Sequence, residues 1–232
     1  MLSHDAARDF YDAFGAQQDN QGHYEDPPLR ALIAHTDLGS ADSVFEFGCG
    51  TGRFAAEILG SQLPPTATYL GCDLSSTMVA LAQERLKPFA DRAEVRPADG
   101  KPKAPCADVS VDRFLSTYVL DLLSAEDIAS ALAEARRILR PGGLLGVTGL
   151  TPGNTLVSRC TSSLWRIVHT ISPRTVGGCR PLRLLDHVDR GAWTVVHHEV
   201  LVAARIPSEV VVLRKPSAGE TLLPRGGQPE AR

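Results

Sequence analysis

At 232 residues, the chain is long enough for one sizeable domain and short for two. Its 43% hydrophobic and 22% charged residues are ordinary for a soluble globular protein. A net charge of −3 argues against nucleic acid or an anionic membrane as a partner held by bulk charge.

The cysteines and the N-terminal residues indicate the compartment. There are five cysteines, an odd number without a CxxC pair, so neither a disulfide framework nor a zinc knuckle is predicted and reduced thiols are expected. The N-terminal residues lack a basic-then-apolar signal pattern, and no apolar run approaches the about 20 residues that a spanning helix requires. We therefore expect a cytoplasmic protein with no integral membrane segment.

The order of predicted elements indicates the fold class. Residues 1–40 predict two short amphipathic helices with breaks near Asn20–Gly22 and at Pro27–Pro28. Strand-like and helix-like segments then alternate from Ser43 to Leu150, with Ser124 as a helix N-cap and the turn RPGG ending that helix. This alternation predicts parallel strands joined by helical crossovers. The expected fold is α/β, a doubly wound (Rossmann-like), mostly parallel seven-stranded sheet.

The pattern changes after Leu150. A helix is predicted around Asn154–Ile171, followed by a Pro/Gly-rich loop, Arg174–Leu185. Two strands separated by a turn at Pro207-Ser208 predict an antiparallel C-terminal edge hairpin. We expect one domain over residues 1–215, with a cofactor-binding core at 43–150 and the helix, loop and terminal strands at 151–215. Residues 216–232 have the composition of a disordered tail.

A glycine-rich loop follows the first strand of the alternating region. Gly48, Gly50 and Gly52 lie on the first strand-to-helix turn, where open α/β sheets bind ligands. Asp73 ends the next strand, where a carboxylate can accept hydrogen bonds from both hydroxyls of a ribose. Together they predict a cofactor that contains a nucleoside.

The loop fits two cofactors in two registers. Residues 50–55 satisfy the GxGxxG/A pattern of a dinucleotide site. In the other register Glu46 stands two residues before Gly48, where a carboxylate would repel a pyrophosphate but attract an ammonium and a sulfonium. Glu46 therefore favours S-adenosylmethionine over a dinucleotide.

Four segments in order carry a resemblance to a known family: VFEFGCGTGRFA, YLGCDLSSTMVALAQERL, VRPADG and EARRILRPGGLLGVTGL. They resemble the motifs of class I S-adenosylmethionine-dependent methyltransferases, in particular the small-molecule group that includes ubiquinone/menaquinone-biosynthesis and phospholipid N-methylating enzymes. The resemblance implies transfer of a methyl group to an O, N or C nucleophile of a small acceptor, lipid-like molecules included, and S-adenosylhomocysteine as product. Glu46 stands where the family more often has Asp, which keeps the charge.

The resemblance also implies roles for individual residues. Glu46 and the loop Gly48–Gly52 would hold the methionine end and Asp73 the ribose; Leu74 and Met78 would pack on the adenine, with Asp99 and Gly100 at its amino group. The cofactor-binding candidates are Glu46, Gly48, Cys49, Gly50, Gly52, Asp73, Leu74, Met78, Asp99, Gly100 and Ser116. Each of these residues also has a purely structural interpretation. Asp73 could be a helix N-cap, Asp99-Gly100 a plain turn and Met78 part of a helix core.

The acceptor side is less defined. By the resemblance, the end of the fourth strand, Ser116 to Tyr118, faces the transferable methyl, and residues 1–40 fold over the cofactor as a lid. The substrate candidates are Tyr11, Gln18, Tyr24, Thr117 and Arg180, and the candidates for a catalytic base are His23, Tyr11 and Tyr118. A base is optional for an acceptor that is already deprotonated. Two unpaired cysteines, Cys160 and Cys179, do not by themselves predict a chemical role.

Two alternatives to a methyltransferase stay open from the residues. One is a non-catalytic protein that keeps the fold for binding or regulation; the other is an NAD-dependent oxidoreductase, which Glu46 and the missing substrate domain disfavour. The pair His197–His198 lies on a predicted edge strand and is interpreted as structural. No metal is predicted, because no ligand cluster occurs at a fixed spacing. The sequence does not predict the oligomeric state.

Overall fold

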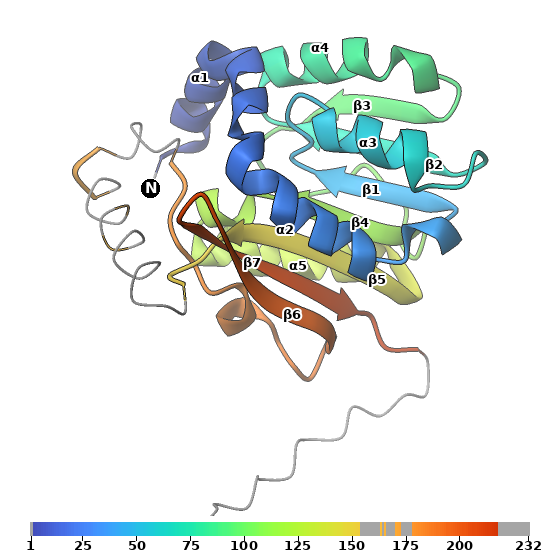
Figure 1. Ribbon diagram of the computed structural model, residues 1–232. Coiled ribbons are helices and arrows are strands. Elements are labelled where there is room, and N and C mark those ends of the chain that lie inside the picture. Colours follow the sequence, from blue (N-terminus) through green and yellow to red (C-terminus); the bar gives the residue numbers. More distant parts are fainter. Residues whose placement is uncertain (1, 154–162, 164, 166–169, 173–177, 218–232) are drawn as a thin grey trace, which may run out of the picture.

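The computed structural model describes residues 2–153, 163, 165, 170–172 and 178–217. Helices and strands alternate in the predicted way from residue 43 onward (Figure 1). The helices are α1 (His4–Phe14), α2 (Gly22–His35), α3 (Arg53–Ser61), α4 (Ser76–Arg85) and α5 (Ala125–Ile138). The strands are β1 (Ser43–Phe47), β2 (Thr68–Asp73), β3 (Ala93–Pro97), β4 (Val111–Thr117), β5 (Leu139–Leu150), β6 (Thr194–Ala203) and β7 (Ile206–Arg214). Short 3₁₀ helices are η1 (Gly15–Gln21), η2 (Leu38–Ser40), η3 (Lys87–Phe89), η4 (Leu120–Leu122) and η6 (Leu184–His187).

The seven strands form one sheet in the order β3-β2-β1-β4-β5-β7-β6. Strands β1 to β5 pair in parallel, β7 pairs antiparallel with β5, and β6 pairs antiparallel with β7. The expected α/β, doubly wound, mostly parallel sheet with an antiparallel edge hairpin is therefore confirmed. The strand order reverses between β1 and β4, so the crevice for a ligand lies at the carboxyl ends of these two strands.

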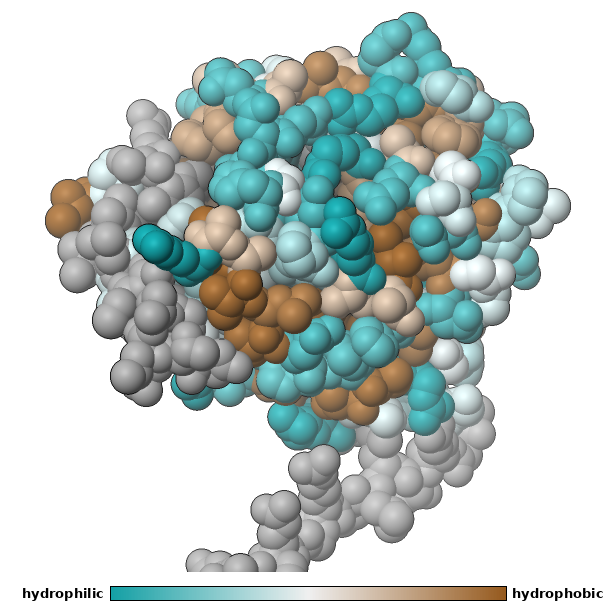
Figure 2. All heavy atoms as spheres, in the orientation of Figure 1, coloured by the Kyte–Doolittle hydropathy of each residue, from teal (hydrophilic) through white to brown (hydrophobic). Residues whose placement is uncertain are grey.

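Helices cover both faces of the sheet (Figure 1). Alternate side chains of each strand point to opposite faces. Val44 thus packs with α2, α3 and α4 in one hydrophobic core, whereas the adjacent Phe45 packs with α5 in the other. The surface over α2 and the edge hairpin is mostly hydrophilic, with small apolar groups between the polar ones (Figure 2).

Three local predictions were wrong. Pro27 and Pro28 lie inside α2 instead of breaking it, although neither has the N–H group for an intrahelical hydrogen bond, and Pro28 is buried. Helix α5 ends at Ile138, and the RPGG segment belongs to β5, beside a register shift in its pairing with β4.

The hairpin turn is Ala204-Arg205, both with positive φ, rather than Pro207-Ser208. Turns with two positive φ angles match the twist of a hairpin but favour Asn and Gly. The sequence Ala-Arg therefore did not indicate a turn at this position. The helix predicted around Asn154–Ile171 lies mostly outside the described residues, as do Cys160 and the tail from residue 218.

Candidate active site

The glycine loop between β1 and α3 requires its glycines. Gly48, Gly50 and Gly52 have φ angles of +77°, +52° and +73°, a region that side chains with a Cβ rarely adopt. A Cβ on Gly48 would lie 2.3 Å from Val119 Cγ2, and one on Gly52 would lie 3.0 Å from the backbone of Ala82. The loop is therefore held close to the segment after β4 and to α4, and it presents bare backbone toward the crevice.

Asp73 connects this loop to the next helix. Its Oδ2 accepts a hydrogen bond from Gly50 N at 2.9 Å, and its Oδ1 accepts one from Ser75 N, also at 2.9 Å. Burial raises the pKa of Asp73, and these backbone bonds counteract that effect. Ser75 in turn caps α4 by accepting from Met78 N. The carboxylate thus fixes both backbone segments that border the cleft.

Glu46 and Gln18 place two buried acceptor atoms beside the loop. Glu46 is fully buried on β1, and its Oε2 accepts a hydrogen bond from Tyr69 Oη at 2.6 Å. Its Oε1 has no hydrogen-bond donor among the described residues, and neither has the buried Oε1 of Gln18. That atom of Gln18 lies 2.8 Å from the position of a Cβ on Gly50. Two unsatisfied acceptors beside a glycine loop fit a ligand that brings N–H donors, such as an ammonium group.

Two adjoining clefts meet at this loop. The larger encloses about 920 Å³ of space, part of it open to solvent, and the smaller about 430 Å³. The predicted residues on the larger cleft's wall are Gly48, Gly50, Asp73, Leu74, Met78, Gly100, Tyr11, Gln18, Thr117 and Tyr118. Glu46 and Cys49 line the smaller cleft, which also contains Glu25 and Arg53.

Tyr118 lies on the wall of both clefts in an unusual conformation. Its φ is +55°, although it is not glycine, and its hydroxyl lies 2.9 Å from Ser208 Oγ on β7. Strained residues of this kind cluster at functional sites. The ring of Tyr24 packs edge-on against the ring of Tyr118.

Six predicted site residues are not on the cleft walls. Gly52 is the N-cap of α3, and Tyr24 is a buried residue of α2. Ser116 is fully buried and donates to Phe47 O, so it ties β4 to β1. Asp99 is exposed and accepts from Lys101 N, the arrangement of a plain Asp-Gly turn.

His23 and Arg180 also lie elsewhere. The ring of His23 is exposed and hydrogen-bonded to Asn20 O. Arg180 donates to Leu123 O at 2.6 Å, and its backbone N donates to Asp121 O. In this structure Arg180 therefore fixes the segment after β4 and does not reach the cleft.

The structure adds wall residues that the sequence did not indicate: Leu2, His4, Ala7, Lys101, Leu122, Leu123, Ser124 and Asp127. Those on α1 come from a helix without buried residues, and its pattern carries no signal for a ligand. His4 approaches Asp127 at 3.6 Å, which brings the start of α1 against the start of α5 across the cleft.

Two acidic residues hold the N-terminal segment against the core. Asp12 on α1 accepts hydrogen bonds from Ser75 Oγ and Thr77 N at the start of α4, and the bond from Ser75 lowers the pKa of Asp12. Asp19 in η1 pairs with Arg85 and accepts from Thr51 Oγ1. These polar contacts hold α1 and η1 over the cleft, whereas α2 packs into the hydrophobic core through Leu29 and Leu32.

Three buried acids have raised pKa values in the folded protein. Burial raises the pKa of Glu46 from 4.5 to about 7, that of Glu25 to about 7 and that of Asp121 to about 6. A folded-state pKa above the unfolded value means that the folded state loses stability as pH rises through this interval.

We expect the free energy of unfolding of the ligand-free protein to fall between pH 5 and pH 8. Below its ordinary pKa Glu46 is protonated in both states, whereas above about 7 it is ionised in both and the folded state bears the cost of a buried charge. Urea denaturation at several pH values measures the slope. Glu46→Gln should make the fall of the unfolding free energy with pH shallower without removing it, because Glu25 and Asp121 remain. A fall as steep as in the wild type, or a rise with pH, would contradict this account.

Comparison with known proteins identifies a methyltransferase domain within the chain. A model of the methyltransferase domain matches residues 44–143. The chain is 29% identical over 146 residues to the tRNA N(3)-methylcytidine methyltransferase Mettl2 of Drosophila melanogaster, covering 59% of this chain and 45% of that protein. It is 32% identical over 124 residues to the ubiquinone/menaquinone biosynthesis C-methyltransferase UbiE of Geobacter sulfurreducens, covering 51% and 46%. The chain thus spans about half the length of these two curated relatives.

A solved structure supports the same fold. Geranyl diphosphate methyltransferase in complex with SAM aligns with a TM-score of 0.62 at 14% identity, covering 82% of this chain and 85% of that chain. Residues 44–143 therefore carry a methyltransferase domain of the class that uses S-adenosylmethionine. This match favours S-adenosylmethionine over a dinucleotide as the cofactor. Within the described residues, no helix has the length and apolar character needed to cross a bilayer.

Proposed function

We propose that this protein transfers a methyl group from S-adenosylmethionine to an O, N or C nucleophile of a small, largely apolar molecule, lipid-like acceptors included. The observation that carries the proposal is the larger cleft, which α1 borders on one side and Asp73 with the glycine loop on the other. A cleft bordered in this way suits a small acceptor that enters beside the cofactor. Its wall is rich in apolar side chains, among them Leu2, Leu122 and Leu123.

The residues of this chain fit the cofactor's parts. Asp73 would accept hydrogen bonds from the ribose hydroxyls, since each carboxylate oxygen has acceptor capacity beyond its one backbone bond. Glu46 and Gln18 would receive the ammonium at their unsatisfied oxygens. Leu74 and Met78 would pack on the adenine. When bound, the cofactor supplies a methyl group activated by its sulfonium.

The chain's own contribution is positioning and exclusion of water. Thr117 and Tyr118 at the end of β4 and Tyr11 on α1 border the space for the acceptor, and their hydroxyls would orient it. The N-terminal segment would act as a lid that closes through Asp12 and Asp19. The proposal includes a cytoplasmic location, because the described cysteines Cys49, Cys72, Cys106 and Cys179 are free thiols.

The test is incorporation of labelled methyl from S-adenosylmethionine, with the purified chain and a panel of acceptors. The panel contains apolar phenols, quinols and carboxylic acids, polar small molecules and bulk tRNA. Tritium in the organic-extractable small molecules is the expected result. Label in tRNA alone would overturn the acceptor class and favour a substrate like that named for the Drosophila relative. No transfer to any member, despite binding of S-adenosylhomocysteine, would favour a non-catalytic binding protein.

The same assay tests the lid. Asp12→Ala removes the acceptor that holds α1 on α4, so transfer should slow and S-adenosylhomocysteine should dissociate faster, by about tenfold for the loss of a charged hydrogen bond. Asp9→Ala, an exposed position on the same helix, is the matched control and should leave both rates unchanged. Equal rates in the two variants would argue against a lid.

A further inference from the structure

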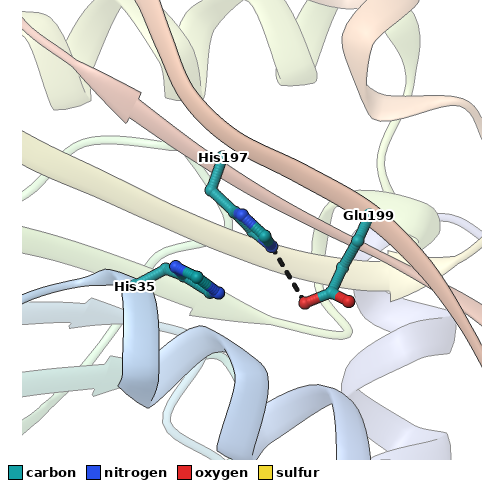
Figure 3. A group of neighbouring side chains, drawn as sticks. All are labelled: His35, His197 and Glu199. Carbon is teal, nitrogen blue, oxygen red and sulfur yellow. Dashed lines mark hydrogen bonds and ion pairs between the residues drawn. The ribbon is translucent and has the colours of Figure 1, made fainter.

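Three potential metal ligands meet on the outer side of the sheet, away from both clefts. His35 is the last residue of α2, and His197 and Glu199 lie two residues apart on the edge strand β6. Residues two apart on a strand point to the same face, and α2 packs on that face of β6. Figure 3 shows the three side chains directed toward one another from the helix and the strand.

The cluster is close-packed. The rings of His35 and His197 are stacked with centroids 3.5 Å apart and an angle of 11° between their planes. His197 Nε2 lies 2.9 Å from Glu199 Oε1. One ligand atom from each of the three residues falls within 4.8 Å of the others.

The donor set suits a transition-metal ion. Two imidazole nitrogens and one carboxylate oxygen form a three-ligand set that zinc sites complete with water. Zinc bonds of about 2 Å in a tetrahedron hold the ligand atoms about 3.3 Å apart. The three side chains are close enough to reach that arrangement by rotation, because His35 is exposed and the other two are only partly buried.

We propose that His35, His197 and Glu199 bind one divalent transition-metal ion that fastens the end of α2 to the edge strand β6. The ion has no part in methyl transfer, since none of its ligands lines either cleft. Its effect is mechanical. Helix α2 carries Tyr24 and Glu25 near its other end, beside the clefts, so a bound ion would stabilise the helix that supports them.

The test is calorimetric titration of the full chain with Zn²⁺, after treatment with a chelator and in a buffer that does not bind metal. We expect one ion per chain and a rise in the thermal unfolding midpoint on binding. His197→Ala should weaken binding by about tenfold or more and abolish the rise. The matched control is His198→Ala, because His198 points to the opposite face, where it pairs with Glu209 at 2.7 Å. That variant should bind Zn²⁺ like the wild type.

A second readout reports the ligand type directly, in the wild type and in variants. Co²⁺ bound by two imidazoles and a carboxylate gives visible d–d bands without the thiolate charge-transfer band that cysteine ligands produce. His35→Ala and Glu199→Gln should each weaken the d–d bands. The proposal is overturned if the wild type binds no Zn²⁺, if all three ligand variants bind it unchanged, or if the Co²⁺ spectrum shows thiolate ligation. In each of these cases the cluster is a hydrogen-bonded stack only.

Discussion

Asp73→Ala is expected to lower the affinity for S-adenosylhomocysteine by about a hundredfold or more. The substitution removes the acceptor of two backbone hydrogen bonds, from Gly50 N and Ser75 N, and with it the anchor of the glycine loop. Under the proposed placement it also removes the acceptor of the ribose hydroxyls. Hydrogen bonds to a charged group contribute about 1.5–3 kcal/mol each. The loss of the two bonds to the ribose hydroxyls therefore accounts for a hundredfold or greater loss of affinity. Calorimetric titration of wild type and variant measures it.

The control separates binding from folding. Glu94→Gln removes an exposed carboxylate on β3 that pairs with Arg96 and lies outside the clefts, and its affinity should equal that of the wild type. Asp73→Asn keeps one acceptor oxygen and should bind with intermediate affinity. Urea denaturation shows which variants are folded. A folded Asp73→Ala protein with wild-type affinity would remove Asp73 from the cofactor site.

Gly52→Ala should destabilise the protein through both a backbone contact and backbone strain. The added Cβ would lie 3.0 Å from the Cα of Ala82, which is backbone and cannot rotate away, and the φ of +73° is itself unfavourable for alanine. The left-handed conformation costs about 1–2 kcal/mol and overpacking about 1–3 kcal/mol. The free energy of unfolding should therefore fall by about 2–5 kcal/mol in urea denaturation.

Gly60→Ala is the matched control at the other end of α3. A Cβ there meets Phe89 at 3.7 Å, an ordinary contact, and alanine is favoured over glycine inside a helix. This variant should be more stable than the wild type by about 0.5–1 kcal/mol. If the Gly52→Ala variant were as stable as Gly60→Ala, the loop could not have the left-handed backbone at Gly52.

Much of the fold was predictable because it depends on local patterns. The alternation of apolar segments predicted the crossovers, and Val44 and Phe45 do supply opposite faces of the sheet. The three glycines after β1 predicted a loop that needs positive φ angles, and all three have them. Asp73 ends the adjacent strand, and parallel strands end at the same edge of the sheet, so its approach to Gly50 follows from topology.

Predictions that depended on the direction of one side chain fared less well. Ser116 and Arg180 were expected at ligands, but each hydrogen-bonds a backbone carbonyl of a neighbouring segment. Their residue types fit either environment, and only the packing around them selects one. The turn at Ala204-Arg205 was missed for a related reason: pairing of the flanking strands imposes the positive φ angles on residues that do not favour them.

The sequence by itself therefore determined the order of strands and helices along the chain, the glycine loop and the acid beside it, because residues close in the chain or at equivalent strand ends define them. Only the tertiary structure brought Gln18 over Gly50 and His4 toward Asp127, which builds the outer side of the cleft from α1 and η1. It alone joined His35 to His197 and Glu199. These contacts connect segments far apart in the chain, and their geometry is set by how α1 and α2 pack on the sheet, which no periodicity or spacing encodes.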